Sequence, residues 1–322
     1  MDDVVIPPFD ALPKLPQSGL KHAWDVWGRG DNLGTLNRLT GPAVAAAALS
    51  CVRTGERIGL SLPLGLPDPP FFGRKGFRHG FVPMSHSAWD DWIDGFYLQC
   101  SSQWDGLRHV GSADGWYGGW RGQPDDDLEP LGIHHWAERG IIGRGVLVDL
   151  TRSPRATALS GGYDPFTRVA FEPEDIAGAL RAQGTELLDG DILCVRTGWT
   201  DRYLDLDQAA RTGLAAGMQQ VTGYTSAGLA GTEGMARFLW DSGVAAVACD
   251  NPAVEVVPGD PAQGSLHGRV IPGLGLAIGE LFSFGALAAA CADQGRYEFL
   301  FTSVPLNVTG AVGSPATAVA VL

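Results

Sequence analysis

The sequence has little charge and no long hydrophobic run. Charged residues make up 18% of the 322 residues and hydrophobic residues 45%, a composition typical of a chain with a packed core. No stretch reaches the roughly eighteen continuous apolar residues that a transmembrane helix needs, so we expect none. The beginning of the sequence lacks the basic and apolar regions of a signal peptide, which favours a cytoplasmic location.

Basic residues are also scarce. The chain has 23 lysines and arginines against 36 aspartates and glutamates, which gives a formal net charge of −13. Such a surface repels the phosphates of nucleic acids and of anionic lipids. We therefore expect neither a nucleic acid nor a membrane as a partner.

The motifs of several common sites are missing. There is no G-x-S-x-G, P-loop or H-E-x-x-H motif, so a serine hydrolase, an NTPase and a zincin are unsupported. The five cysteines include no C-x-x-C pair and stand in apolar contexts, which favours buried free thiols over disulfides or a thiolate zinc site. These cysteines are Cys51, Cys100, Cys194, Cys249 and Cys291.

Glycine and proline are plentiful, with 45 and 21 residues, which favours many turns and long ordered loops over a helical bundle. Residues 1–39 are predicted to be an irregular N-terminal arm and residues 63–93 a long loop, which is uncommon unless functional.

Capping and proline signals predict helices from Pro42 to just before Gly55, from Glu172 onward, after Thr232 and near 281–292. Apolar runs predict strands at 58–62, 96–99, 146–150, 192–196, 244–249 and 299–306.

Short apolar strands alternate with helices in the second half of the chain. This pattern predicts an α/β fold with a mixed or parallel, buried central sheet, flanking helices and long ordered loops. No charge run or serine-rich linker divides the sequence, so residues 1–322 are predicted to form a single domain.

Two groups of residues have side chains suited to chemistry. If residues 99–105 form a strand, Gln99, Gln103 and Asp105 share one face, and His109 follows a glycine that permits a bend. An acid and an imidazole at the end of a strand suit a metal centre or an acid–base pair, although a structural hydrogen bond is the simpler interpretation. Further on, His267 and Glu280 flank a Pro-Gly turn and suit Zn²⁺ or Mn²⁺, with a surface histidine and a helix-start glutamate as the alternative.

The chain resembles the cyclase family of metal-dependent hydrolases, which includes bacterial kynurenine formamidase and isatin hydrolase. The resemblance covers most of the chain and is closest to a larger branch of roughly 320 residues. It rests on the segments 27–37, 103–109, 140–149, 190–199, 250–255, 267–280 and 313–315. It implies a swivelling β/α/β fold and a homodimer or homotetramer.

The family signature is H-x-G-T-H-x-D-x-P-x-H. Aligned on Asp105, it places Gln99 and Gln103 where the two leading histidines stand, while Asp105 and His109 match. The resemblance then implies that Asp105, His267 and Glu280 are the ligands of one metal and that His109 is the general base. The other metal has lost both imidazoles, and a neutral amide oxygen is a poor substitute toward Zn²⁺. One Mn²⁺ or Zn²⁺, or no metal, is therefore expected.

These residues imply metal-assisted hydrolysis of an amide, lactam or lactone in a small cyclic or aromatic substrate, with His109, Asp105 and Glu280 as the catalytic residues. Secondary metabolism is the expected setting. Two alternatives stay open: metal-independent cyclisation, dehydration or isomerisation of a polyketide-like molecule, and a non-catalytic small-molecule binder. Substrate contacts are expected from Gln99, Gln103, Trp104, Trp116 and Trp120, although core packing is the simpler interpretation for most of the tryptophans.

Overall fold

The computed structural model describes residues 4–219 and 223–322. Nine strands form one mixed sheet in the order β1-β13-β11-β5-β7-β9-β10-β4-β12, and two further pairs, β2–β3 and β6–β8, lie outside it. The strands are β1 (Arg57–Gly59), β2 (Arg78–Ser85), β3 (Ala88–Asp94), β4 (Gln103–Asp105), β5 (Ile141–Asp149), β6 (Ala170–Phe171), β7 (Ile192–Arg196), β8 (Gly228–Leu229), β9 (Ala246–Cys249), β10 (Ala277–Glu280), β11 (Glu298–Ser303), β12 (Gly313–Pro315) and β13 (Ala318–Val321).

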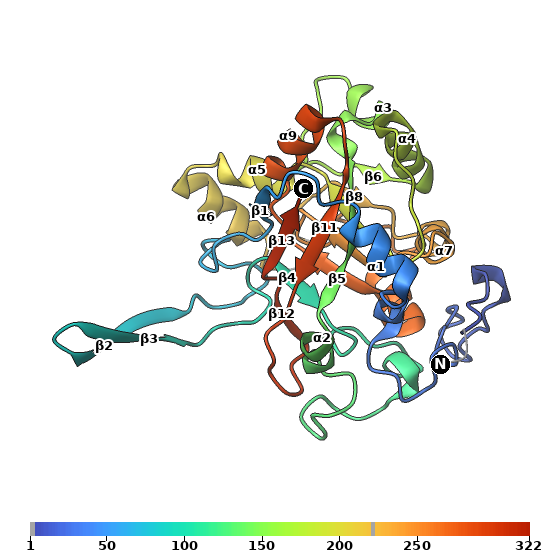
Figure 1. Ribbon diagram of the computed structural model, residues 1–322, viewed down its shortest axis with the longest axis horizontal. Helices are drawn as coiled ribbons and strands as arrows, with labels where there is room; N and C mark the ends of the chain where they lie inside the picture. Colours follow the sequence, from blue (N-terminus) through green and yellow to red (C-terminus); the bar gives the residue numbers. More distant parts are fainter. Residues whose placement is uncertain (1–3, 220–222) are drawn as a thin grey trace.

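The helices cover the sheet on both faces (Figure 1). They are α1 (Pro42–Leu49), α2 (His134–Arg139), α3 (Pro154–Thr157), α4 (Pro173–Gln183), α5 (Trp199–Leu204), α6 (Gln208–Gly217), α7 (Glu233–Asp241), α8 (Leu266–Arg269) and α9 (Gly285–Gln294). None of these described helices combines the length and the apolar character needed to cross a membrane.

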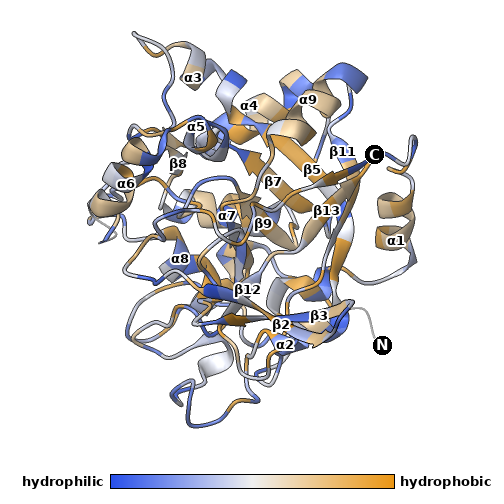
Figure 2. Cartoon of the chain, turned by 90° about the vertical axis from the view of Figure 1, so that its left-hand side faces the viewer, coloured by the Kyte–Doolittle hydropathy of each residue, from blue (hydrophilic) through white to orange (hydrophobic). Residues whose placement is uncertain are grey.

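The central strands β5, β7, β9 and β10 run parallel and carry apolar side chains on both faces. In β5, Val146 and Val148 pack into a core cluster with α4 and α7, while Leu147 between them packs into a second cluster with α9. Figure 2 shows the hydrophobic colour concentrated on these strands. A parallel sheet buried on both faces explains why its strands appear in the sequence as continuous apolar runs. The predicted α/β class and mixed central sheet are confirmed.

Several helix boundaries follow the sequence signals. Thr232 caps α7 by accepting a hydrogen bond from the backbone N–H of Met235, and Pro173 begins α4. Residues 4–39 are irregular apart from two short 3₁₀ turns, and residues 1–3 of the predicted N-terminal arm lie outside the described residues. All five cysteines are buried and free, as expected.

Two local predictions are wrong. Residues 63–93 are not all loop, because 78–94 form the β2–β3 hairpin, which projects from the body of the molecule (Figure 1). Residues 96–99 are not a strand; Gln99 lies in a turn that precedes β4. The strand that carries the candidate chemistry starts four residues later, at Gln103.

Gly34 offers a test of the packing between the N-terminal segment and the sheet. It has a φ of +60°, and a Cβ placed there would stand 2.0 Å from the carbonyl oxygen of Gly275. Gly34→Ala is therefore expected to lower the free energy of unfolding by about 2–5 kcal/mol, from backbone strain and overpacking combined. Gly178→Ala within α4 is the matched control, because a Cβ there would meet only the Arg181 side chain, at an ordinary contact distance of 3.8 Å, and alanine favours a helix by up to about 1 kcal/mol. Denaturant unfolding measures both, and equal stability of the two variants would contradict the prediction.

Candidate functional site

Two neighbouring strands bring the candidate carboxylates together. Strand β4 pairs antiparallel with β10, so that Gln103 lies opposite Glu280 and Asp105 lies opposite Ile278. Residues directly opposite one another in a sheet point to the same face, so the side chains of Gln103, Asp105 and Glu280 share one side. All three are buried. Glu280 ends a strand, so the alternative of a helix-start glutamate is wrong.

Trp104 points the other way, because side chains alternate along a strand. It is fully buried and packs against Phe282 and Phe301, with ring centroids 5.2 and 6.1 Å away, and its indole N–H donates to Ser303 Oγ at 2.9 Å. The predicted substrate contact from Trp104 is therefore wrong: this residue is part of the core on the opposite face of the sheet from Asp105.

His267 completes the group from the short helix α8. Its Nε2 lies 3.1 Å from Glu280 Oε1 and 3.8 Å from Asp105 Oδ2. Its other ring nitrogen, Nδ1, donates to Glu255 Oε1 at 2.7 Å, and Glu255 also accepts backbone N–H groups of Leu266 and His267. A carboxylate behind an imidazole fixes the orientation of the ring and directs Nε2 forward. Sequence reasoning did not single out Glu255, since no spacing rule connects it to His267.

His109 stands beside Asp105 on the solvent side of the group. Its Nε2 lies 3.8 Å from Asp105 Oδ1, and its side chain is 29% exposed. The side-chain amide of Gln99 donates to Asp105 Oδ1 and also lies 2.9 Å from Nδ1 of His109. Because the amide N–H is the donor, Nδ1 of His109 is the acceptor and a neutral ring carries its proton on Nε2. Gln99 thus reaches the group from its turn rather than from a strand.

The charges of the group perturb one another. Burial alone would raise the pKa of Asp105, but the imidazoles of His109 and His267 outweigh it and hold the pKa below its ordinary value. Burial and the neighbouring charge of Asp105 raise the pKa of Glu280 to about 7. Burial opposes a charged His267, but the nearby carboxylate of Asp105 and hydrogen bonds to Glu255 and Glu280 raise its pKa well above the ordinary value. Without a metal, His267 therefore keeps a positive charge between three carboxylates.

The donor set fits one divalent metal. One ligand atom from each of Asp105, His267 and Glu280 lies within 4.8 Å of the other two. Asp105 Oδ2 is buried and accepts no hydrogen bond from any described residue, which leaves it free for a ligand. Two carboxylates and an imidazole are ligands that Zn²⁺ and Mn²⁺ both accept.

Two glutamines occupy the remaining side of the carboxylates. Gln103 donates through Nε2 to Glu280 Oε2 at 2.8 Å and lies 3.4 Å from Asp105 Oδ1, the same oxygen that accepts from Gln99. Amide N–H groups thus donate hydrogen bonds to Asp105 Oδ1 and Glu280 Oε2, the carboxylate oxygens that do not face His267. Because donors already hold these oxygens, the arrangement supports one cation rather than two.

Strained backbone flanks two of the carboxylates. Val254, which precedes Glu255, has a φ of 54°, and Leu281, which follows Glu280, has a φ of 55°. Positive φ is costly for residues other than glycine, and such residues concentrate at functional sites. The strain occurs where the chain turns to present Glu255 and Glu280.

Trp116 and Trp120 lie near the loop that carries His109. Their ring centroids are 6.3 Å apart, the guanidinium of Arg108 lies 4.7 Å from the ring of Trp120, and both rings are partly buried. Arg108 is itself buried and bonded to backbone carbonyls, so these contacts support the His109 loop. The expected substrate contacts from Trp116 and Trp120, and from Gln99 and Gln103, stay predictions.

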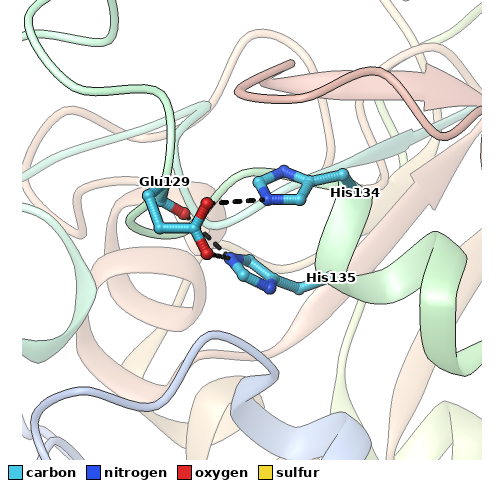
Figure 3. A group of neighbouring side chains, drawn as sticks. All are labelled: Glu129, His134 and His135. Atoms are coloured by element: carbon cyan, nitrogen blue, oxygen red, sulfur yellow. Dashed lines mark hydrogen bonds and ion pairs between the residues drawn. The ribbon is translucent and has the colours of Figure 1, made fainter.

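A second group of possible ligands lies at and just before the start of α2: Glu129, His134 and His135 (Figure 3). The backbone N–H of Gly310 donates to Nδ1 of His134 at 3.2 Å, so the proton of neutral His134 is on Nε2. Nε2 of His135 lies 2.8 Å from the carbonyl oxygen of Glu129 and must donate to it. Metal binding through Nε2 would move the proton of neutral His134 to Nδ1, against the N–H of Gly310, and would break the bond from His135 to Glu129, whereas Nδ1 of His267 can keep its proton on Glu255. We assign no metal to this group.

Metal binding at Asp105, His267 and Glu280 should depend steeply on pH. The Nε2 proton of His267 must leave, and Glu280, with a pKa of about 7, must be ionised. Protons therefore compete with metal below neutral pH, and the affinity for Mn²⁺ is expected to rise from pH 6 to pH 8 by about tenfold per unit for each proton released. Titration calorimetry in buffers of different ionisation enthalpy counts those protons. His135→Gln serves as a control that should leave the count unchanged, and an affinity that is flat over this range would refute the assignment.

The comparisons with known proteins identify the family of the chain. A family model described as “Cyclase: Putative cyclase” matches residues 58–256, a range that includes Asp105, His109 and Glu255. A crystal structure described as a novel cyclase is 31% identical in sequence, with a TM-score of 0.78 over 94% of this chain and 99% of that one. No curated protein matches the chain.

More distant solved structures share the fold. Isatin hydrolase A from Labrenzia aggregata is 18% identical, with a TM-score of 0.54 over 89% of this chain and 98% of that one. Isatin hydrolase A from Ralstonia solanacearum is 14% identical, with a TM-score of 0.55 over 87% of this chain and 95% of that one. From the family match and the 31% identical structure together, the chain belongs to the cyclase family.

Proposed function

We propose that the protein is a metal-assisted hydrolase that cleaves an amide, lactam or lactone bond in a small cyclic or aromatic substrate. The observation that carries the proposal is the convergence of Asp105, His267 and Glu280 within 4.8 Å, with His109 3.8 Å from Asp105. The two isatin hydrolases with a related fold act, by their names, on a fused aromatic lactam. Because these two proteins are only 18% and 14% identical to this chain, they support the fold alone. The proposed substrate class is inferred from the residues of the site.

Asp105, His267 and Glu280 would hold one Mn²⁺ or Zn²⁺, with Glu255 fixing the ring of His267. A divalent metal held there supplies an acidified water and a polarised carbonyl. Of the two imidazoles in this group, His109 is the more exposed, with 29% of its side chain accessible against 15% for His267, which makes it the better placed to exchange a proton with a bound water.

His109 has one ring nitrogen, Nδ1, that is able to take up and return a proton. Its Nδ1 lone pair accepts a hydrogen bond from Gln99, and it takes a proton once the attacking water replaces that amide. The water oxygen bonds to the carbonyl carbon as this proton moves to Nδ1. When the C–N or C–O bond breaks, Nδ1 gives this proton to the leaving atom, so the ring returns to its neutral form with the proton on Nε2 and the products are an acid and an amine or alcohol. Asp105 next to Nε2 stabilises the imidazolium between these steps.

A metal-independent acid–base reaction is the second candidate. The charged His267 offsets one of the negative charges, and Gln99 and Gln103 cover the oxygens that a second metal would need. A site whose negative charge is partly offset without a metal can perform cyclisation, dehydration or isomerisation with Asp105 and His109 alone. A non-catalytic binder would use the same polar group to hold its ligand.

One experiment separates these functions. Chelator-treated protein is assayed with isatin, formanilide and dihydrocoumarin, which represent a lactam, an amide and a lactone, before and after addition of Mn²⁺ or Zn²⁺. We expect hydrolysis of at least one substrate with metal, and a loss of at least 1000-fold on chelation or in Asp105→Asn, since metal and base effects act together. Turnover that survives chelation supports the acid–base alternative. Binding without turnover under every condition supports the binder, and either result overturns the proposal.

A further inference from the structure

Tyr224 is a buried phenol whose hydroxyl has no partner in the described part of the chain. The residue is 7% exposed, and its oxygen forms no hydrogen bond with any described residue. Its ring packs in one cluster with Leu281, which follows Glu280, and with Val257, two residues after Glu255. Because a buried hydroxyl without a hydrogen bond costs free energy and is rare in native proteins, this one requires an explanation.

The carboxylates of the candidate site act on this phenol. Burial raises the pKa of Tyr224, and the negative charges of Glu280 and Glu255 raise it further. Neither carboxylate accepts a hydrogen bond from the phenol. The phenol therefore keeps its proton at neutral pH and presents an unused donor close to the site.

Arg74 contacts the same aromatic ring as Tyr224. Its guanidinium lies 5.2 Å from the ring centroid of Phe72, and the ring of Tyr224 lies 6.0 Å from that ring. Phe72 has a φ of 60°, a costly conformation for a residue with a side chain, and such residues concentrate at functional sites. The backbone around Phe72 is therefore held in a strained form at the point where the loop presents Arg74.

The positive charge of Arg74 reaches the candidate site. Burial raises the pKa of the Tyr224 phenol, the Cys100 thiol and the Glu280 carboxyl, and in each case this guanidinium opposes the rise. Cys100 follows Gln99 in the turn before β4, so the guanidinium lies within electrostatic range of groups on several sides of the site. Arg74 is partly buried, and it forms no ion pair with a described carboxylate.

A guanidinium and a phenol that both lack an acceptor suit an anionic ligand. The planar guanidinium binds a carboxylate through two parallel hydrogen bonds, and hydrogen bonds to charged groups are stronger than those between neutral groups. The chain as a whole has a net charge of −13 and repels anions. An arginine left unpaired beside buried carboxylates offsets that repulsion at the one place where an anionic ligand would enter.

We propose that Arg74 and Tyr224 bind a carboxylate of the substrate, so that the protein acts on an anionic rather than a neutral small molecule. This inference rests on the proposed function, because the carboxylate belongs to the molecule that is cleaved at the metal site. The contact gives the substrate a second point of attachment, which holds its carbonyl in one orientation toward the metal. A neutral substrate lacks this contact and binds more weakly.

Binding of 3-acetylbenzoate and of its neutral analogue 3-acetylbenzamide tests the proposal. A ketone replaces the bond to be cleaved, so neither compound is hydrolysed there. Titration calorimetry on the full chain with added Zn²⁺ is expected to show the carboxylate binding at least about 10-fold more tightly, and Arg74→Gln should abolish this preference. Lys75→Gln is the matched control, because it removes the same charge from the exposed neighbouring residue and should keep the preference.

Tyr224→Phe supplies a readout that separates binding from a structural role. Loss of the unpartnered hydroxyl should weaken 3-acetylbenzoate binding by about 3–10-fold and leave the midpoint of urea unfolding unchanged. Tyr163→Phe is the matched control, because the hydroxyl of Tyr163 donates to the carbonyl oxygen of Thr197 at 2.7 Å. This control should lower the unfolding midpoint and leave the binding of 3-acetylbenzoate unchanged.

Three results would overturn the proposal: equal binding of the two compounds, binding of neither, or a preference for 3-acetylbenzoate that Arg74→Gln retains. The last result would mean that the metal itself holds the carboxylate. None of these measurements needs turnover. A protein that shows the predicted preference but hydrolyses no substrate contradicts the proposed function, whereas one that hydrolyses formanilide but shows no preference contradicts only this inference.

Discussion

Replacing His267 with alanine is expected to abolish divalent-metal binding and to destabilise the protein. The imidazole is the only nitrogen ligand of the proposed site, and without it Asp105 and Glu280 lie buried with no cation between them. Loss of a ligand should exceed the 10–100-fold effect of losing a supporting residue, so we expect metal affinity to fall by about 1000-fold. An unpaired buried charge should lower the free energy of unfolding of the metal-free protein by about 3–5 kcal/mol at pH 8.

The loss of stability should depend on pH in a defined direction. The pKa of Glu280 is raised to about 7, so at pH 5 its carboxyl binds a proton and the variant suffers less repulsion than at pH 8. Equilibrium binding of Mn²⁺, with denaturant unfolding at both pH values, measures the two effects separately. His135→Ala provides the control, because His135 also faces a carboxylate but belongs to the Glu129 group. Equal metal binding by the parent protein and His267→Ala would refute the proposed site.

The central strands of the sheet could be predicted from the sequence because they are buried on both faces. Strand β7 was predicted with the observed bounds, and β5 and β9 were located, because their residues are apolar on both faces. Helices α4 and α7 were located by proline and threonine at their first turns. These helix signals are local, because each lies within the first turn of its helix or just before it.

The hairpin could not be predicted by the same reasoning. Strand β2 contains Gly80 and Pro83, which normally exclude a strand, and the connection at His86–Ser87 lacks the Asn-Gly or Asp-Gly pair of a tight hairpin turn. Its strands also lack the alternation of buried and exposed residues, because neither face packs on the body. A hairpin with neither face packed on the body leaves no periodic pattern of apolar and polar residues in the sequence.

The site was predicted in part. The pairing of Asp105 with His109 followed from local spacing, but the meeting of His267 and Glu280 with Asp105 depends on the pairing of β4 with β10, which are separated by more than 150 residues. The resemblance to the cyclase family supplied that contact in advance. It did not supply Glu255, and it did not show that Gln99 and Gln103 act as amide donors to the carboxylates. Hydrogen-bond direction becomes visible only once the side chains are placed.

Replacing His109 with glutamine should separate catalysis from metal binding. Glutamine keeps a polar side chain next to Asp105 and Gln99 but cannot take up and return a proton, so the turnover rate is expected to fall by about 10²–10⁴-fold. The affinity for Mn²⁺ should change by no more than about twofold, because His109 is not one of the ligands of the proposed metal. Steady-state kinetics on the substrate found active, together with Mn²⁺ titration, measures both quantities.

His135→Gln again serves as the matched control, and it should change neither the turnover rate nor the affinity for Mn²⁺. If His109→Gln lowers metal affinity as strongly as it lowers turnover, His109 is itself a ligand and the proton must move through another group. If turnover is unchanged, the protonated His267 becomes the remaining imidazole with carboxylate contacts, and the metal-independent alternative would require it to be the acid. Comparing the change in turnover with the change in Mn²⁺ affinity of His109→Gln therefore identifies which imidazole carries the proton during bond cleavage.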